Sequence, residues 1–309
     1  RSRIFESRPE LVPRELHEVN KIVSKYSLSF EPWEDPDEKI ESRLARLDRL
    51  GLPNIPDRRV KGATVLFYPG CQAEERSQEV RESAKLILDH FDVDYTMLDE
   101  MSCCGLPSRL VGDEKTSRVL FDTLMKRIQS TGAKIVVTTC AGCTGNLIEM
   151  SRRTGSTVPV LHMLEFLIEH IGKERLSREL ASVRTPAEPI IVGLHHPCHL
   201  IRHTSRRLAD YALEILGMIP GIDLRTTGVS DWCCGGGGMV GYHSRDVSDS
   251  VTTINVKGIV RSGVQRVLAP CPLCTAQIDS SLYRSGAKAE AEDLTVFVAQ
   301  HLPLRRRTD

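Results

Sequence analysis

The sequence predicts an α/β protein built from two duplicated, Rossmann-like units with mostly parallel sheets, related by a pseudo-twofold axis and preceded by a helical arm. Two observations support this prediction. The ten cysteines fall into two sets of five with nearly the same spacing, and short apolar runs alternate with helical patterns in the same order beside both sets. We expect the arm over residues 1–58, the first unit over 59–185 and the second over 186–309.

The expected arm contains two charged helical stretches, at 14–26 and 37–50, on either side of a Pro-, Trp- and Asp-containing segment at 32–36. It has no counterpart in the repeat. We expect it to pack on the core or on a partner, with a poorly ordered leader as the alternative.

The first unit begins with an apolar run at 65–68, which predicts a buried strand broken by a Pro-containing turn before Cys71. Helices and strands then alternate up to the first Cys-x-x-Cys. The predicted helices are 80–91 and 114–130, and the further predicted strands are 95–98 and 134–139.

The second unit repeats this order after a natural linker, Pro186–Pro189. Its predicted strands are 190–194, 222–225 and 265–269, and its predicted helices are 208–216 and 246–262. In both units the cysteines follow the carboxyl ends of strands, which is where open α/β sheets bind their ligands.

The cysteine pattern is Cys-x31-Cys-Cys-x35-Cys-x-x-Cys in the first unit and Cys-x34-Cys-Cys-x36-Cys-x-x-Cys in the second. No cysteine lies outside the repeat. The first set is Cys71, Cys103, Cys104, Cys140 and Cys143, and the second set is Cys198, Cys233, Cys234, Cys271 and Cys274.

Metal binding explains these cysteines better than disulfides, because the sequence carries no secretory signal and the cytosol keeps thiols reduced. A structural zinc site takes four ligands, whereas each set offers five thiols, two of them adjacent. Adjacent cysteines suit different irons of one larger cluster, so the pattern favours iron–sulfur clusters. An ordinary four-iron cluster needs only four thiolates, so the fifth is either spare or a bridging ligand.

Glycines directly after both Cys-Cys pairs also favour a bulky inorganic ligand. Residues without a Cβ let backbone N–H groups approach and hydrogen-bond to cluster sulfides. These candidate cofactor-binding residues are Gly105, Gly235, Gly236, Gly237 and Gly238.

The ten cysteines and both Cys-Cys-Gly triplets resemble the CCG-domain motif of the catalytic subunit of heterodisulfide reductase, in its B or D type, and of related Fe–S oxidoreductases. Tyr68–Cys71 and the His-His-Pro-Cys-His-Leu-x-Arg run at 195–202 also match. The resemblance covers about residues 60–300. His196 departs from the family pattern, which often has Asp there, and this leaves the details of proton delivery and substrate open.

The resemblance implies two noncubane [4Fe–4S] clusters, each held by one set of five cysteines, that split a small-molecule disulfide of the coenzyme M–coenzyme B type. It also implies an electron-donating partner subunit, which is ferredoxin-like, a flavoprotein or a cytochrome b. The arm is similar to the segment that joins an upstream ferredoxin domain in the longer form of the subunit. The alternative function is an electron-transfer subunit of a lactate or glycerol 3-phosphate type flavin dehydrogenase that passes electrons to quinone.

Disulfide cleavage consumes two protons, and histidine is the side chain best suited to deliver them near neutral pH. The candidate catalytic residues surround Cys198, and Arg202 among them is suited to hold an anionic group. Packing at the strand end is the alternative explanation for each. The candidates are His195, His196, His199, Arg202 and His203, with Arg109 in a comparable loop of the first unit.

Charge and hydropathy limit the other partners. Lys+Arg and Asp+Glu both number 41, so the chain lacks the cationic surplus that nucleic-acid binding requires. No apolar run reaches the ~20 residues of a membrane span. We therefore expect a cytoplasmic protein, with membrane association only through a partner subunit, and a solvated basic end at Arg305–Arg307.

Overall fold

The computed structural model describes residues 1–183 and 185–303, so the basic run Arg305–Arg307 lies outside the described residues. The described chain contains two four-stranded sheets, and every strand pair is parallel. The first sheet has the order β2-β1-β3-β4 and the second has the equivalent order β6-β5-β7-β8. This confirms the predicted duplicated α/β fold.

Six of the eight strands of the described chain were predicted from their apolar residues. The fourth strand of each sheet was not predicted, since β8 has the polar sequence Glu-Ala-Glu-Asp and β4 follows the Cys-x-x-Cys at which the predicted order of elements ends. The strands are β1 (Val65–Phe67), β2 (Tyr95–Thr96), β3 (Ile135–Thr138), β4 (Val160–His162), β5 (Ile190–Leu194), β6 (Ile222–Leu224), β7 (Arg266–Ala269) and β8 (Glu290–Asp293).

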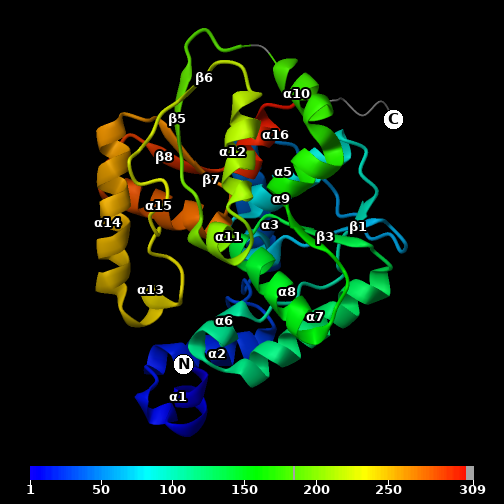
Figure 1. Ribbon diagram of the computed structural model, residues 1–309, viewed down its shortest axis with the longest axis vertical. Helices are drawn as coiled ribbons and strands as arrows, with labels where there is room; N and C mark the ends of the chain where they lie inside the picture. The colour runs from blue at the N-terminus through cyan, green and yellow to red at the C-terminus, as the bar shows by residue number, and fades with distance from the viewer. Residues whose placement is uncertain (184, 304–309) are drawn as a thin grey trace.

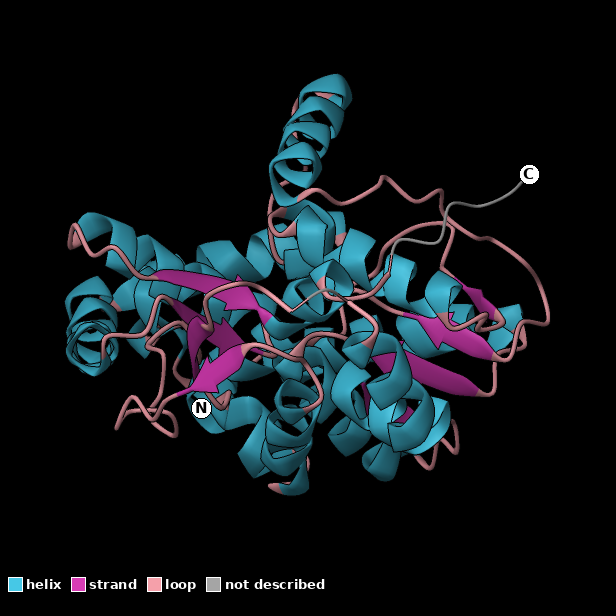
Figure 2. Cartoon of the chain, turned by 90° about the horizontal axis from the view of Figure 1, so that it is seen from above, coloured by secondary structure: helices cyan, strands magenta, loops and turns pink. Residues whose placement is uncertain are grey.

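Figure 2 shows the two sheets on opposite sides of the molecule, with helices between and around them. The helices of the first unit are α4 (Gly70–Glu75), α5 (Gln78–His90), α6 (Leu106–Val111), α7 (Glu114–Thr131), α8 (Ala141–Thr154), α9 (Met163–Phe166), a π-helical turn (Leu167–Gly172) and α10 (Lys173–Ala181). Those of the second unit are α11 (Cys198–His203), α12 (Arg207–Gly217), α13 (Val240–His243), α14 (Arg245–Ser262), α15 (Pro272–Arg284) and α16 (Leu294–Gln300).

The contacts between the halves are reciprocal: where a helix of the first half contacts a helix of the second, the two equivalent helices also contact each other. Helix α4 contacts α15 and its equivalent α11 contacts α8; likewise α5 packs on α16 and its equivalent α12 packs on α9. The equivalent thiols of Cys140 and Cys271 lie within hydrogen-bonding reach of each other. Around a twofold axis, a residue that lies close to the axis contacts the equivalent residue of the other half. The reciprocal contacts therefore establish the predicted pseudo-twofold relation.

The arm packs on the core, as predicted. It consists of α1 (Ser2–Ser7), a short 3-10 turn (Pro9–Leu11), α2 (Arg14–Tyr26) and α3 (Pro36–Leu50). In Figure 1, α1 and α2 lie at one end of the molecule beneath α6; α2 contacts α6 and α13, and α3 contacts α5.

A buried ion network holds the end of the arm, at Asp57, against α5. Lys85 Nζ lies 2.9 Å from Asp57 Oδ1 and 2.8 Å from Glu82 Oε2. Arg81 also pairs with Asp57, at 2.6 Å, and with Glu82. The side chains of Glu82 and Lys85 are 0% and 1% exposed, so each charge is stabilised by its ion-pair partners rather than by water.

Among the described residues, no helix combines the length and the apolar character needed to cross a membrane.

Candidate metal centre

The cysteine loops of the two halves meet at one cavity of about 140 Å³. Each loop follows the carboxyl end of a parallel strand, and the pseudo-twofold axis turns the two strand ends toward each other. All the cysteines except Cys233 line the cavity. All ten are free thiols, and eight are buried, whereas Cys198 is half-buried and Cys233 is exposed.

The thiols of the first set lie against one another. Cys104 Sγ is 3.7 Å from Cys143 Sγ, and Cys71 lies within hydrogen-bonding reach of Cys103. The Gly105 N–H donates to Cys103 Sγ at 3.4 Å. A glycine N–H therefore approaches this site, with a cysteine sulfur as its acceptor.

The second set repeats this geometry. Cys234 Sγ is 3.4 Å from Cys274 Sγ, and Cys198 lies within hydrogen-bonding reach of Cys233. The Gly235 N–H donates to Cys233 Sγ at 3.4 Å and the Gly236 N–H to Cys234 Sγ at 3.5 Å. Gly237 and Gly238, like Gly236, line the cavity.

The glycine of each Cys-Cys-Gly triplet is required by backbone geometry. Gly105 and Gly235 have φ values of +85° and +86°, in the left-handed region. A Cβ on Gly105 would lie 2.5 Å from the Ser117 carbonyl oxygen on α7, and one on Gly235 would lie 2.6 Å from that of Ser248 on α14. Any larger residue would push the cysteine pair away from its helix.

Buried side chains that sequence reasoning missed hold the carbonyls of the paired cysteines. The Asn146 amide donates to the Cys104 carbonyl at 2.7 Å. In the second half the Thr252 hydroxyl donates to the Cys234 carbonyl at 2.9 Å and the Asn255 amide to the Cys233 carbonyl at 2.6 Å. These bonds fix the direction of the thiols, although no motif spacing marks the three residues.

The thiols cannot all ionise as they stand. Hydrogen bonds from Cys103 and Cys143 lower the pKa of Cys104 to about 5, whereas the contact with Cys104 raises the pKa of Cys103 to about 12. Crowded, buried thiolates repel one another unless a cation lies among them. A set of five soft donors in this environment fits an iron–sulfur cluster, which is bound by thiolates.

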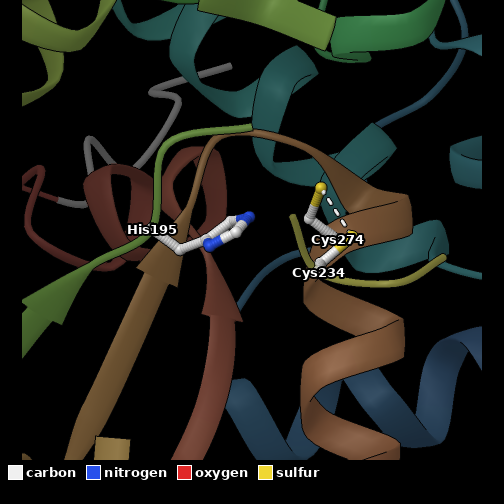
Figure 3. A group of neighbouring side chains, drawn as sticks. All are labelled: His195, Cys234 and Cys274. Atoms are coloured by element: carbon white, nitrogen blue, oxygen red, sulfur yellow. Dashed lines mark hydrogen bonds between the residues drawn. The ribbon is translucent and has the colours of Figure 1, made fainter. Parts of the chain in front are cut away.

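His195 points at the second set of cysteines. One of its ring nitrogens, Cys234 Sγ and Cys274 Sγ are three candidate ligand atoms within 4.8 Å of one another. Figure 3 shows the three side chains. His195 is 2% exposed and its Nε2 has no hydrogen-bond partner among the described residues. Burial lowers the pKa of His195 to about 4, so the ring is neutral and keeps one N–H at pH 7.

The other predicted catalytic residues are only partly brought to the site. His199 lines the cavity, with Nδ1 3.8 Å from Cys198 Sγ. His196 Nδ1 lies 3.6 Å from the carboxylate of Asp231, outside the residues that line the cavity. Arg202 and His203 are exposed at the end of α11, where the His203 ring lies 5.1 Å from the His199 ring and is tilted by 34° against it.

Arg109 does not line the cavity either. Its guanidinium donates to Asn146 Oδ1 at 2.9 Å, and Asn146 in turn holds the Cys104 carbonyl. Arg109 therefore supports the position of the first Cys-Cys pair through Asn146.

The fold and the site define a duplicated α/β protein with two cysteine-rich centres that share one cavity. The chain belongs to the CCG family of cysteine-rich domains, which matches residues 65–148 and 192–279, more than half of its length. The resemblance found in the cysteine pattern is thereby confirmed.

Several known proteins of similar sequence come from methanogens. The B subunit of fumarate reductase (CoM/CoB) from Methanothermobacter marburgensis is 27% identical over 225 residues, which cover 73% of this chain and 43% of that protein. The D subunit of dihydromethanophenazine:CoB–CoM heterodisulfide reductase from Methanosarcina mazei is 26% identical over 285 residues, 89% of this chain and 63% of that protein.

A shorter relative aligns over most of its own length. The B subunit of ferredoxin:CoB-CoM heterodisulfide reductase from Methanosarcina mazei is 26% identical over 239 residues, which cover 69% of this chain and 78% of that protein. This chain spans less than two thirds of the two longer relatives.

Proposed function

We propose that this chain is an iron–sulfur oxidoreductase subunit that binds two noncubane [4Fe–4S] clusters and cleaves a small heterodisulfide, of the coenzyme M–coenzyme B type, between them. The observation that carries the proposal is the single cavity onto which both cysteine sets open. A relay of electrons between separate partners would not need both centres to face the same space. The relatives named as heterodisulfide reductase subunits support this class of reaction.

The chain's own residues bind and orient the disulfide. Cleavage of an S–S bond takes up two electrons and two protons, and the bound clusters would supply the electrons. Apolar side chains of Leu106, Leu110 and Leu273 line the cavity, which suits the aliphatic part of a thiol coenzyme and excludes water around it. His199 lines the same space beside Cys198, so it is the histidine placed to hold a proton near a product sulfur.

An electron-donating partner subunit completes the proposal, since the relatives carry subunit names. The test is anaerobic release of both thiols from the heterodisulfide with reduced viologen as the donor. Two thiols per disulfide would support the proposal. Viologen oxidation without thiol release would point instead to an electron-transfer subunit of a flavin dehydrogenase.

We expect about eight irons and a matching amount of acid-labile sulfide per chain, because each set of five thiols would hold a four-iron cluster. Anaerobic metal analysis of the purified chain measures this. Stoichiometric zinc, or only about four irons in a fully loaded sample, would contradict two four-iron clusters.

Replacement of His195 by leucine is expected to lower thiol release about 10–100-fold, the usual cost of losing a group that supports a metal ligand. The reason is its unpartnered Nε2 beside Cys234 and Cys274. Loss of a nitrogen or exchangeable-proton coupling from one EPR signal would locate the effect at the second set. His196→Leu, at a histidine that lies beside Asp231 rather than beside the cysteines, is the control, and equal losses in both variants would show that His195 has no special role.

A further inference from the structure

The first set of cysteines is contacted by a segment that lies outside the duplicated units. Helix α2 of the arm ends at Tyr26, and Ser27 follows with a φ of 53°, in the left-handed region that a non-glycine residue seldom adopts. This turn sends the chain toward the metal centre. The Cys103 N–H donates to the Ser27 carbonyl at 2.7 Å, which ties the turn to the Cys-Cys pair.

Ser29 reaches two cysteines of the first set. Its Oγ lies 3.7 Å from Cys103 Sγ. Its hydroxyl and its backbone N–H are also within hydrogen-bonding reach of Cys71. A hydrogen-bond donor beside a cysteine sulfur stabilises the thiolate, which is the form that binds a metal.

Apolar packing holds Ser29 in this position. Leu28 is buried in one cluster with Val19 and Val23 of α2 and with Cys71 and Cys103 themselves. Ser29 and Phe30 then form part of the cavity wall. Under this cover Cys71 and Cys103 are 5% and 1% exposed, whereas their equivalents Cys198 and Cys233 are half-buried and exposed.

We infer that the arm supplies Ser29 as a hydrogen-bond donor to Cys71 and Cys103 and thereby sets the reduction potential of the first cluster apart from that of the second. The inference rests on the proposed iron–sulfur clusters but not on disulfide cleavage. A reduced cluster carries one more negative charge, so donors to its thiolates stabilise the reduced form and raise its potential. Ser29 is a positioning and tuning residue in this scheme.

The experiment is a redox titration of the iron-loaded full chain followed by EPR. The signal that persists in Cys233→Ser is assigned to the first set. In Ser29→Ala the midpoint potential of this signal should shift to a more negative value while that of the second signal stays unchanged. Ser24→Ala, an exposed serine of α2, should leave both potentials unchanged, and Ser29→Thr, which keeps the hydroxyl, should restore the first.

An unchanged first potential in Ser29→Ala, or equal shifts of both potentials, would overturn the inference. Ser29→Ala could instead lose iron from the first set, and the Ser29→Thr variant then tests the inference. If Ser29→Thr binds iron at the first set but does not regain the original potential, the inference is also overturned. The disulfide assay is separate: a selective shift in a chain that releases no thiols would leave the inference standing and remove the proposed reaction.

Discussion

Replacement of Cys233 by serine is expected to remove nearly all thiol release from the heterodisulfide, although the first set of cysteines stays complete. Both sets face one cavity, so the two sulfurs of one disulfide would each need their own set. Cys103→Ser, which changes the first set and leaves the second complete, should have the same effect. Groups that act as a unit are not additive, so the double variant should be little worse than either single variant.

The measurement is heterodisulfide turnover in each variant, normalised to its remaining iron. Dye reduction that does not involve the disulfide serves as the control, because it reports whether the remaining cluster still accepts electrons. Half of the activity in each single variant would indicate two independent sites, and cleavage across a shared cavity would then be wrong.

Replacement of Lys85 by methionine is expected to lower the free energy of unfolding by about 3 kcal/mol, the lower end of the range for breaking a buried ion pair. The change leaves the fully buried carboxylate of Glu82 without one of its two cations. Arg81 remains beside it, which is why the lower end of the range applies. Methionine keeps most of the side-chain volume, so the loss reports charge rather than a cavity.

Urea unfolding of the full chain measures this change. The matched control is Lys21→Met, which breaks the exposed pair of Lys21 with Glu18 and should leave the free energy of unfolding nearly unchanged, because exposed ion pairs contribute little. Similar values for the two variants would mean that the network around Lys85 contributes no more than a surface pair.

Helices and strands with a regular pattern of apolar residues could be predicted from the sequence, and elements without such a pattern could not. Helix α2 and strand β5 have the predicted bounds because their apolar residues recur at the spacing of a helix or as a buried run. The short helices α4 and α11 begin within Pro-Gly-Cys and Pro-Cys sequences, which predict turns. Strand β8 exposes Glu290 at a sheet edge, so it lacks the apolar run that marks the central strands.

The candidate site divides in the same way. The ten cysteines repeat, so their convergence at one place could be predicted. Arg202 and His203 were predicted because they are near Cys198 in sequence, but they lie about one helical turn after it on α11 and are exposed. Ser29 and Asn146 reach the site through tertiary packing alone, and such packing leaves no spacing signal in a sequence.

The reciprocal contacts between the halves have a consequence for how the two centres can differ. If two identical chains formed the same interface, symmetry would impose the same side chain at both copies of every position. Here Tyr68 and His195 occupy equivalent places, each three residues before the first cysteine of its set and each donating its N–H to the neighbouring strand. Tyr68 turns its hydroxyl to the Ser102 carbonyl, whereas His195 turns its ring to Cys234 and Cys274. Because both halves belong to one chain, equivalent positions can carry different side chains. The protein therefore has the architecture of a symmetric dimer but different chemistry in its two halves.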